Sequence, residues 1–169
     1  VLHDTFSRLD DPAVLQDSML KLVPEPEQRR WNVPDMIKRA GWREEDFAAF
    51  RRSRARQDLF LRQFVAGGGI VAAGTDAANQ MLIPGYSLHR EMELLVGAGM
   101  EPRAALQAAT RNGALVLGVD SLGLLAPGKV ADLVVLSRDP LADIHNTLAI
   151  EQVMSRGRLF PSDSLRQGW

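Results

Sequence analysis

The fold is decided by one stretch of the sequence, Ile70-Val71-Ala72-Ala73-Gly74-Thr75-Asp76. Residues 70–73 form a short apolar run that never alternates to polar residues. Such runs are typical of a strand that is buried on both faces of a parallel sheet. Thr75 and Asp76 follow the run directly. Because α/β folds place their chemistry at the carboxyl ends of parallel strands, the stretch predicts an α/β fold with Asp76 at a functional site.

A long helix is expected before this stretch, over residues 44–66. Three acidic residues open the range and favour a helix N-terminus, and glycines follow its end. The helix carries the most basic cluster of the chain: Arg51, Arg52, Arg54 and Arg56. The cluster has two interpretations. Either the arginines contact phosphate or nucleic acid, or they form a helix face that is exposed to solvent. We favour the solvated face, because Asp58 lies one turn from both Arg54 and Arg62.

Shorter helices are expected after Asp76. Their ranges are 88–98, 102–109 and 110–118. Ser87 and Thr110 stand where they would cap the first and the third of these helices. A strand followed by helices fits the closing part of a β/α fold.

The first 43 residues carry weaker patterns. Val1 and Leu2 have the character of the end of an apolar strand, and a short helix is expected over residues 13–22. Prolines interrupt residues 23–43, where we expect an irregular excursion anchored by its two tryptophans. A long excursion of this kind is either an active-site lid or a surface loop, and the sequence leaves both interpretations open.

A β region ends the sequence. Residues 131–136 predict a strand, and residues 153–160 predict a hairpin with Gly157 in its turn. We expect these strands to pair within one small sheet. The sequence therefore divides into an α/β unit, residues 1–121, and a β appendage, residues 122–169.

The composition is that of a globular protein and excludes several classes of function. The chain has 169 residues, no cysteine, and a net charge of −1 from 20 basic and 21 acidic residues. Near-neutral charge argues against a protein dedicated to nucleic acid or to a membrane surface. No apolar run approaches the roughly 18 residues of a membrane helix. A sequence without cysteine has no disulfide framework, thiolate metal site or cysteine nucleophile, and it indicates no particular compartment.

A series of motifs runs through the second half of the chain in a fixed order. They are Ala73-Gly74-Thr75-Asp76, Ser87-Leu88-His89-Arg90-Glu91-Met92-Glu93-Leu94-Leu95, Ala98-Gly99-Met100, Ala108-Ala109-Thr110-Arg111-Asn112, Leu117-Gly118, Gly123, Pro127-Gly128-Lys129 and Ala131-Asp132-Leu133-Val134-Val135-Leu136. With these motifs, residues 66–160 resemble the C-terminal part of the amidohydrolase superfamily. The resemblance points in particular to the branch that contains imidazolonepropionase-like enzymes and Xaa-Pro or other dipeptidases. It covers more than half of the chain.

The resemblance implies a fold. Family members form a distorted (β/α)8 TIM-like barrel with a composite β-sandwich domain built from both chain ends. Residues 70–73 would be the eighth barrel strand, and Val1 and Leu2 would end the seventh. The chain would then hold the last part of the barrel, followed by the small C-terminal β appendage.

The resemblance also implies a chemistry. Asp76 would bind a divalent metal ion, which in this family is usually zinc. The site would hold one or two such ions. Asp76 would also take a proton from water whose pKa the metal lowers. Thr75, His89 and His3 would line the substrate site. The alternative, which we favour for both histidines, is that His3 is an ordinary loop histidine and that His89 packs its helix with a bond to the backbone. The implied reaction is hydrolysis of a C–N bond in a small amide or peptide substrate.

The sequence departs from the family in its metal ligands. Its only histidines are His3, His89 and His145, and it has neither a His-x-His pair nor the bridging lysine. A barrel takes roughly 250 residues, so we expect a C-terminal fragment of a longer enzyme, inactive by itself and dependent on an N-terminal barrel segment. Without that segment we expect self-association or a homo-oligomer. The alternative is a non-catalytic relative that keeps the scaffold for binding.

Overall fold

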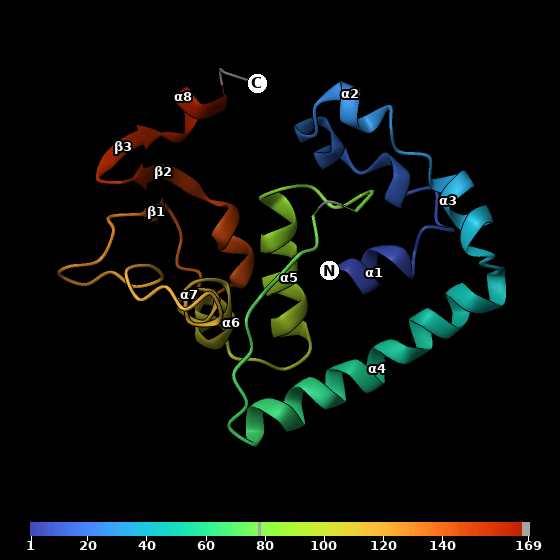
Figure 1. The fold of residues 1–169 in the computed structure, drawn as a ribbon, viewed down its shortest axis with the longest axis horizontal. Coiled ribbons are helices and arrows are strands. Elements are labelled where there is room, and N and C mark those ends of the chain that lie inside the picture. The colour runs from blue at the N-terminus through green and yellow to red at the C-terminus, as the bar shows by residue number, and fades with distance from the viewer. Residues whose placement is uncertain (78, 167–169) are drawn as a thin grey trace.

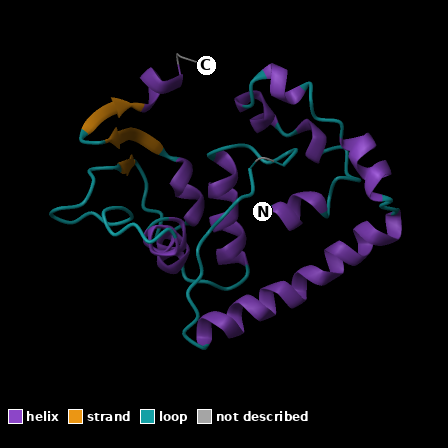
Figure 2. Cartoon of the chain, viewed as in Figure 1, coloured by secondary structure: helices purple, strands orange, loops and turns teal. Residues whose placement is uncertain are grey.

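The computed structural model describes residues 1–77 and 79–166, and its regular structure is mostly helical (Figure 1). The helices before residue 67 are α1 (Leu2–Phe6), the 3-10 helices η1 (Val14–Gln16) and η2 (Ser18–Leu22), α2 (Glu25–Gln28), α3 (Val33–Ala40) and α4 (Glu44–Ala66). The later helices are α5 (Tyr86–Gly97), α6 (Pro102–Ala109), α7 (Arg111–Val116), the 3-10 helix η3 (Ile144–Leu148) and α8 (Ser162–Arg166). The strands, which Figure 2 shows side by side, are β1 (Leu133–Leu136), β2 (Ile150–Ser155) and β3 (Arg158–Pro161). In the described part of the chain, every helix is too short or too polar to cross a membrane.

The long helix α4 lies where the sequence predicts it. Its first turn is closed by Asp46, whose carboxylate accepts the backbone N–H of Arg43 at 2.8 Å. It ends at Gly67. In Figure 1 the helix runs along one edge of the molecule, from α3 to the turn that leads back toward α5. The helices predicted after Asp76 are confirmed as α5, α6 and α7.

Ser87 and Thr110 do not cap helices as predicted. The Oγ of Ser87 accepts the backbone N–H of Ile83 at 2.8 Å, in the turn before α5. The Oγ1 of Thr110 donates to the carbonyl oxygen of Leu106 at 2.7 Å, so it closes the end of α6 instead of opening α7. Both hydroxyls bond backward along the chain, which is a common alternative to capping for these residue types.

The prediction that Val1 and Leu2 end a strand is wrong for this chain. Leu2 is the first residue of α1, and the backbone N–H of Thr5 donates to the carbonyl oxygen of Val1 at 2.9 Å. A strand needs a neighbouring strand to satisfy its backbone groups. The strands among the described residues all belong to the sheet at the other end of the chain. A helical turn satisfies the same backbone groups locally.

The next region differs from the prediction in two ways. Residues 13–22 contain the 3-10 helices η1 and η2 where one short helix is expected, and residues 23–43 contain α2 and α3 where an irregular excursion is expected. Asn32 caps α3, because its Oδ1 accepts the backbone N–H of Asp35 at 3.1 Å. Pro34 lies in the first turn, where a missing N–H costs nothing. This proline therefore helps to start a helix instead of interrupting the chain.

The tryptophans anchor this region, as predicted. Trp42 lies edge-on to the rings of Phe6, Phe47 and Phe50, with centroids 5.9, 6.0 and 5.3 Å away. Such edge-to-face contacts suit the charge distribution of aromatic rings. Trp31 packs against the same cluster. The cluster joins α1, α3 and α4 into the core of the N-terminal half.

The segment at residues 69–76 is extended, but it is not the strand that the sequence predicts. Val71 and Ala73 pack against the core that α5, α6 and η3 form, whereas the side chain of Ile70 is 59% exposed. The N–H of Ala73 donates to the carbonyl oxygen of Ala108 at 2.9 Å, and not to another strand. The segment is therefore buried on one face instead of two, because no parallel neighbour among the described residues covers the other face.

The β appendage contains the sheet that the sequence predicts. β2 pairs antiparallel with both β1 and β3, in the order β1-β2-β3. Arg156 and Gly157 form the hairpin turn with φ of 50° and 80°. These are the two left-handed residues that a type I′ turn requires. The 3-10 helix η3 packs against α5 and so connects the sheet to the helices.

The basic cluster on α4 is largely the solvated face that the sequence predicts, since Arg51, Arg52 and Arg56 are exposed, but Arg51 and Arg54 also bind other parts of the chain. Nη1 of Arg51 donates to the carbonyl oxygen of Ser7 at 2.8 Å, and Nη2 of Arg54 donates to that of Leu94 at 3.2 Å. Nε of Arg54 also donates to Asp58 at 2.6 Å, which is the pair that the spacing predicts. These arginines hold α4 against the chain after α1 and against the end of α5.

At Gly123 the chain, which has left the end of α7, packs back against the start of that helix. The φ of Gly123 is 80°, and a Cβ at this position would lie 2.9 Å from both the Cα of Arg111 and the carbonyl oxygen of Thr110. Both are backbone atoms, which cannot rotate away. The chain passes here only because residue 123 has no side chain.

We expect Gly123→Ala to lower the free energy of unfolding by about 3 kcal/mol, because it adds overpacking to a left-handed backbone. Gly128→Ala is the matched control, since its φ is 82° and nothing lies within 4 Å of its Cβ position. It should cost only the backbone strain of about 1 kcal/mol. Denaturant unfolding of both variants measures the difference, and equal losses would contradict the close approach at Gly123.

Candidate functional site

Asp76 is an exposed aspartate at the end of the extended segment. Its φ is 56°, which is uncommon for a residue other than glycine, although Asp and Asn adopt it more readily than most. The backbone N–H and the Nδ2 of Asn79 both donate to the carbonyl oxygen of Asp76, at 3.0 and 3.1 Å. The backbone of Asp76 is thus held in the left-handed region while its carboxylate stays in contact with solvent.

The two histidines predicted near the site have different surroundings. His89 lies on α5, and its Nδ1 is buried without a hydrogen-bond partner. Burial lowers the pKa of His89, against the opposing effect of Glu93. His3 lies on α1, with its Nε2 2.9 Å from the Oγ of Ser53 on α4. Burial and the charge of Arg54 lower the pKa of His3. Both shifts favour the neutral form of the ring.

The structure does not join the four predicted site residues to one another. Within residues 1–77 and 79–166, no hydrogen bond or ion pair connects any two of Thr75, Asp76, His89 and His3. The same residues hold no group of three or more His, Cys, Asp or Glu side chains that could bind a metal ion. The described residues by themselves therefore do not fit a complete metal site, and Asp76 is the one predicted ligand among them.

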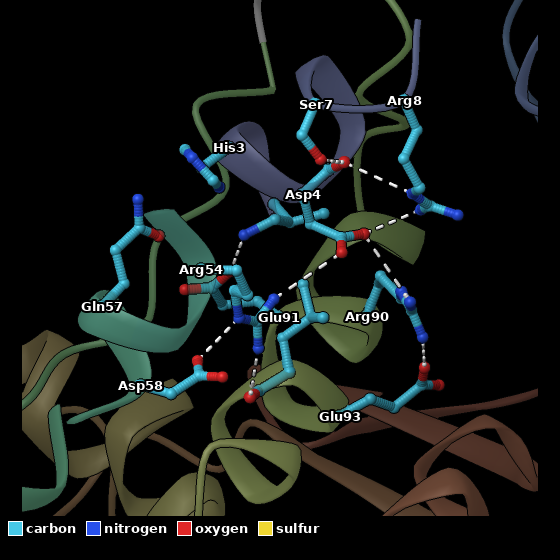
Figure 3. A network of polar contacts seen from close by, with 12 residues as sticks. His3, Asp4, Ser7, Arg8, Arg54, Gln57, Asp58, Arg90, Glu91 and Glu93 are labelled. Atoms are coloured by element: carbon cyan, nitrogen blue, oxygen red, sulfur yellow. Dashed lines mark hydrogen bonds and ion pairs between the residues drawn. The ribbon is translucent and has the colours of Figure 1, made fainter. Parts of the chain in front are cut away.

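A charged network is centred on the carboxylate of Asp4 (Figure 3). Oδ2 of Asp4 lies 2.7 Å from Nη2 of Arg8 and 3.6 Å from Nη2 of Arg90, and Oδ1 lies 3.6 Å from Nη1 of Arg54. The side chain of Asp4 is only 17% exposed. One carboxylate therefore brings together guanidinium groups from α4, from α5 and from the turn after α1.

The network continues from α5 into the β appendage. Nη1 of Arg90 donates to Oε2 of Glu93 at 2.8 Å, and the same oxygen lies 3.9 Å from Nε2 of His145. Nδ1 of His145 lies 2.7 Å from the carboxylate of Asp143. The hydrogen bond to the carboxylate of Asp143 and the charge of Glu93 raise the pKa of His145. His145, which the sequence analysis left without a role, thus belongs to the contact between η3 and α5.

A cavity of about 300 Å³ opens beside the network. Its walls come from α1, from η1 and η2, and from residues 81–93. Arg8, Arg90 and Tyr86 line it, and the sequence analysis singled out none of them as site residues. Burial, together with the charges of Asp17 and Glu93, raises the pKa of Tyr86. The only hint in the sequence is that Tyr86 and Arg90 flank the Ser-Leu-His motif that follows Asp76.

Comparison with known proteins supports the resemblance found in the sequence. The model of the amidohydrolase family matches residues 17–160. An imidazolonepropionase of Deinococcus deserti is 37% identical over 93 residues, which cover 54% of this chain and 23% of that protein. An ochratoxinase of Aspergillus niger is 34% identical over 121 residues, which cover 66% of this chain and 24% of that protein. The chain therefore spans about a quarter of the length of these curated relatives.

The solved structures agree with the sequence comparison. A crystal structure of a Bifidobacterium longum protein assigned as a prolidase superposes with a TM-score of 0.61 at 30% identity. The superposition covers 78% of this chain and 35% of that protein. The family match includes Asp76, α4 to α7 and most of the sheet. On this match, the chain belongs to the amidohydrolase family.

Proposed function

We propose that this chain is part of a metal-dependent amidohydrolase that hydrolyses a C–N bond in a small amide or peptide. Asp76 is the metal ligand and the proton acceptor in this proposal. The observation that carries it is the position of Asp76, an exposed carboxylate on a left-handed backbone within the range that the family model matches. Unusual backbone conformations at residues other than glycine concentrate at functional sites.

The chemistry assigned to Asp76 is proton transfer. A divalent metal, zinc in this proposal and one or two ions in number, would supply the chemistry that lowers the pKa of water toward neutrality. Asp76 would be one of the residues that hold it, and its carboxylate would take a proton from water and pass it to the leaving amine. The described residues hold no group of side chains that could bind a metal ion by itself, and the proposal places the remaining ligands in parts of the complete protein outside this sequence. In the complete protein, residues 70–73, which pair with no strand among the described residues, would become the eighth strand of a (β/α)8 barrel once a neighbouring segment is present.

In the complete protein, we expect Asp76→Asn to lower kcat at least about a hundredfold, because the proton acceptor is lost. The fold should be retained, since asparagine also tolerates the left-handed backbone. Steady-state hydrolysis of a panel of amides and dipeptides, with circular dichroism of the same samples, measures both effects.

Asp120→Asn is the matched control, because Asp120 is an exposed aspartate outside the proposed site. It should hydrolyse amides as the unaltered protein does. Near-normal turnover by Asp76→Asn would contradict the role of Asp76. A complete protein that binds amides without hydrolysing any of them would favour the alternative, a non-catalytic binding scaffold.

Residues 1–169 alone should bind zinc only weakly. A hydrolytic zinc site needs about three protein ligands, and the proposal finds one of them in this sequence. Titration calorimetry with zinc chloride measures the affinity. A tight site with one zinc ion per chain would show that the metal site is complete within these residues.

The proposal also assigns a partner to the exposed apolar surface. Ile70 on the extended segment, together with Leu115, Val116 and Leu117 at the end of α7, is more than half exposed. An N-terminal barrel segment of the complete protein would cover the surface at Ile70, as neighbouring strands do in a closed barrel.

Residues 1–169 alone should therefore self-associate, because large apolar patches and unpaired extended segments recruit other chains. Sedimentation velocity over a range of concentrations measures the association. A compact monomer that unfolds cooperatively and binds no hydrophobic dye would contradict the need for a barrel partner.

A further inference from the structure

The 12–31 segment, which lies between α1 and α3 (Figure 1), makes its polar contacts within itself. In the described part of the chain, every hydrogen bond and every ion pair of the segment ends within residues 11–31. The chain is fixed on either side of the segment. Nη1 of Arg51 donates to the carboxylate of Asp10 at 2.9 Å, and Asn32 caps α3. The segment is therefore a unit with two anchored ends and no polar bond to the body of the protein.

Apolar side chains hold the 12–31 segment in place. Val14, Leu20 and Trp31 pack against the cluster that joins α1, α3 and α4, and each of the three is only partly buried. Among residues 12–31, all of which the structure describes, only Val23 is buried. Separation of these contacts would break no hydrogen bond, and the bonds inside the segment would be kept. Regions with few buried apolar contacts open at a lower free energy than the core does.

The 12–31 segment covers the turn that carries Asp76. One side of the cavity of about 300 Å³ comes from the segment, and the other side includes Met81 and Ile83. The backbone N–H of Leu82 donates to the carbonyl oxygen of Asn79 at 3.3 Å, and Asn79 in turn bonds to Asp76. Met81, like Asp76, has a left-handed backbone, with φ of 65°. The segment therefore rests on a turn with two uncommon backbone conformations, which concentrate at functional sites.

We propose that the 12–31 segment is a lid, which opens as one unit between its anchored ends and closes over substrate at the turn that carries Asp76. The sequence leaves a lid and a surface loop equally open for this part of the chain. A lid must separate easily from the body and must cover a site, and the contacts of the segment meet both conditions. Closure of such a lid excludes water and commits the substrate. The identity of the substrate, a small amide or peptide, rests on the proposed function, whereas the opening does not.

Hydrogen exchange of the complete protein, measured by mass spectrometry, tests the opening. Peptides that cover residues 13–23 and 24–31 should share one protection factor, because the segment opens as a unit. That factor should be at least about a hundredfold lower than the protection of residues 47–66 in α4, which belong to the core. Protection equal to that of α4 would make the segment part of the core. Different factors for the two peptides, or no protection at all, would make it a loose surface loop. Each of these results would overturn the proposal.

A pair of leucines on η2 assigns the closed state to its apolar contacts. Leu20→Ala removes a side chain that packs on the body, and it should speed exchange of the 12–31 segment about tenfold. Leu22→Ala is the matched control, because Leu22 lies on the same 3-10 helix and is 45% exposed. It should leave the exchange rate unchanged. Unaltered exchange of α4 in the same samples shows that both variants are folded. Equal rates in the two variants would contradict the closure that we describe.

Substrate should close the lid. The probe is the dipeptide that the complete protein hydrolyses fastest, kept at about ten times its KM through a pulse of labelling that is shorter than its depletion. Exchange of the 12–31 segment should slow about tenfold, because a ligand that binds only the closed form lowers the open population in that proportion. The edge strand β3, on the other side of the molecule in Figure 1, is the control and should keep its rate.

The results separate the lid from the function on which its substrate rests. If the dipeptide is hydrolysed and exchange of the 12–31 segment stays the same in its presence, the lid fails while the hydrolase remains. If no amide or peptide is hydrolysed, the proposed hydrolysis fails. The lid then stands or falls by the common protection factor and by the response to Leu20→Ala, neither of which needs a substrate.

Discussion

The arrangement of the N-terminal half depends on how the carboxylate of Asp4 is neutralised. A carboxylate that is mostly withdrawn from water is costly unless cations and hydrogen bonds replace its hydration. Arg8 does so locally, whereas Arg54 and Arg90 must be brought in from α4 and α5. Because Arg54 also donates to the carbonyl oxygen of Leu94 at the end of α5, one side chain satisfies a helix end and a buried charge together. The positions of three helices are thereby coupled.

Sequence reasoning succeeded where the interactions are local. The acidic start of α4, the sequence Arg156-Gly157 in the hairpin turn and the strand pattern of the β appendage all act within a few residues, and each predicted element is present. Sequence reasoning failed where a segment becomes a strand only if another segment lies beside it. Val1, Leu2 and residues 70–73 have the composition of strands, but a strand exists only beside another strand, and residues that would supply one are not among those described.

The residues of the candidate site and of the charged network also differ in whether the sequence singles them out. The sequence singles out Asp76 as a candidate because it comes soon after an apolar run, a signal that a single stretch carries, and its role stays a prediction. Arg8 and Arg90 could not, because they lie far apart in the sequence and resemble any arginine on a helix surface. Only the shared oxygen of Asp4 brings them to one cavity. The pairing of His145 with Asp143 and its approach to Glu93 are likewise set by the packing of η3 on α5, which no local pattern records.

The left-handed backbone at Asp76 has an evolutionary consequence. A position with φ of 56° accepts aspartate, asparagine and glycine, and strains a β-branched residue. If Asp76 has the role proposed above, a lineage that lost this role would still be under pressure to keep one of these three residues for the sake of the turn. Replacement of aspartate by asparagine or glycine would then accompany loss of the role within an intact scaffold, whereas replacement by valine or isoleucine would mark a rebuilt loop. The two kinds of divergence can be distinguished at this single position.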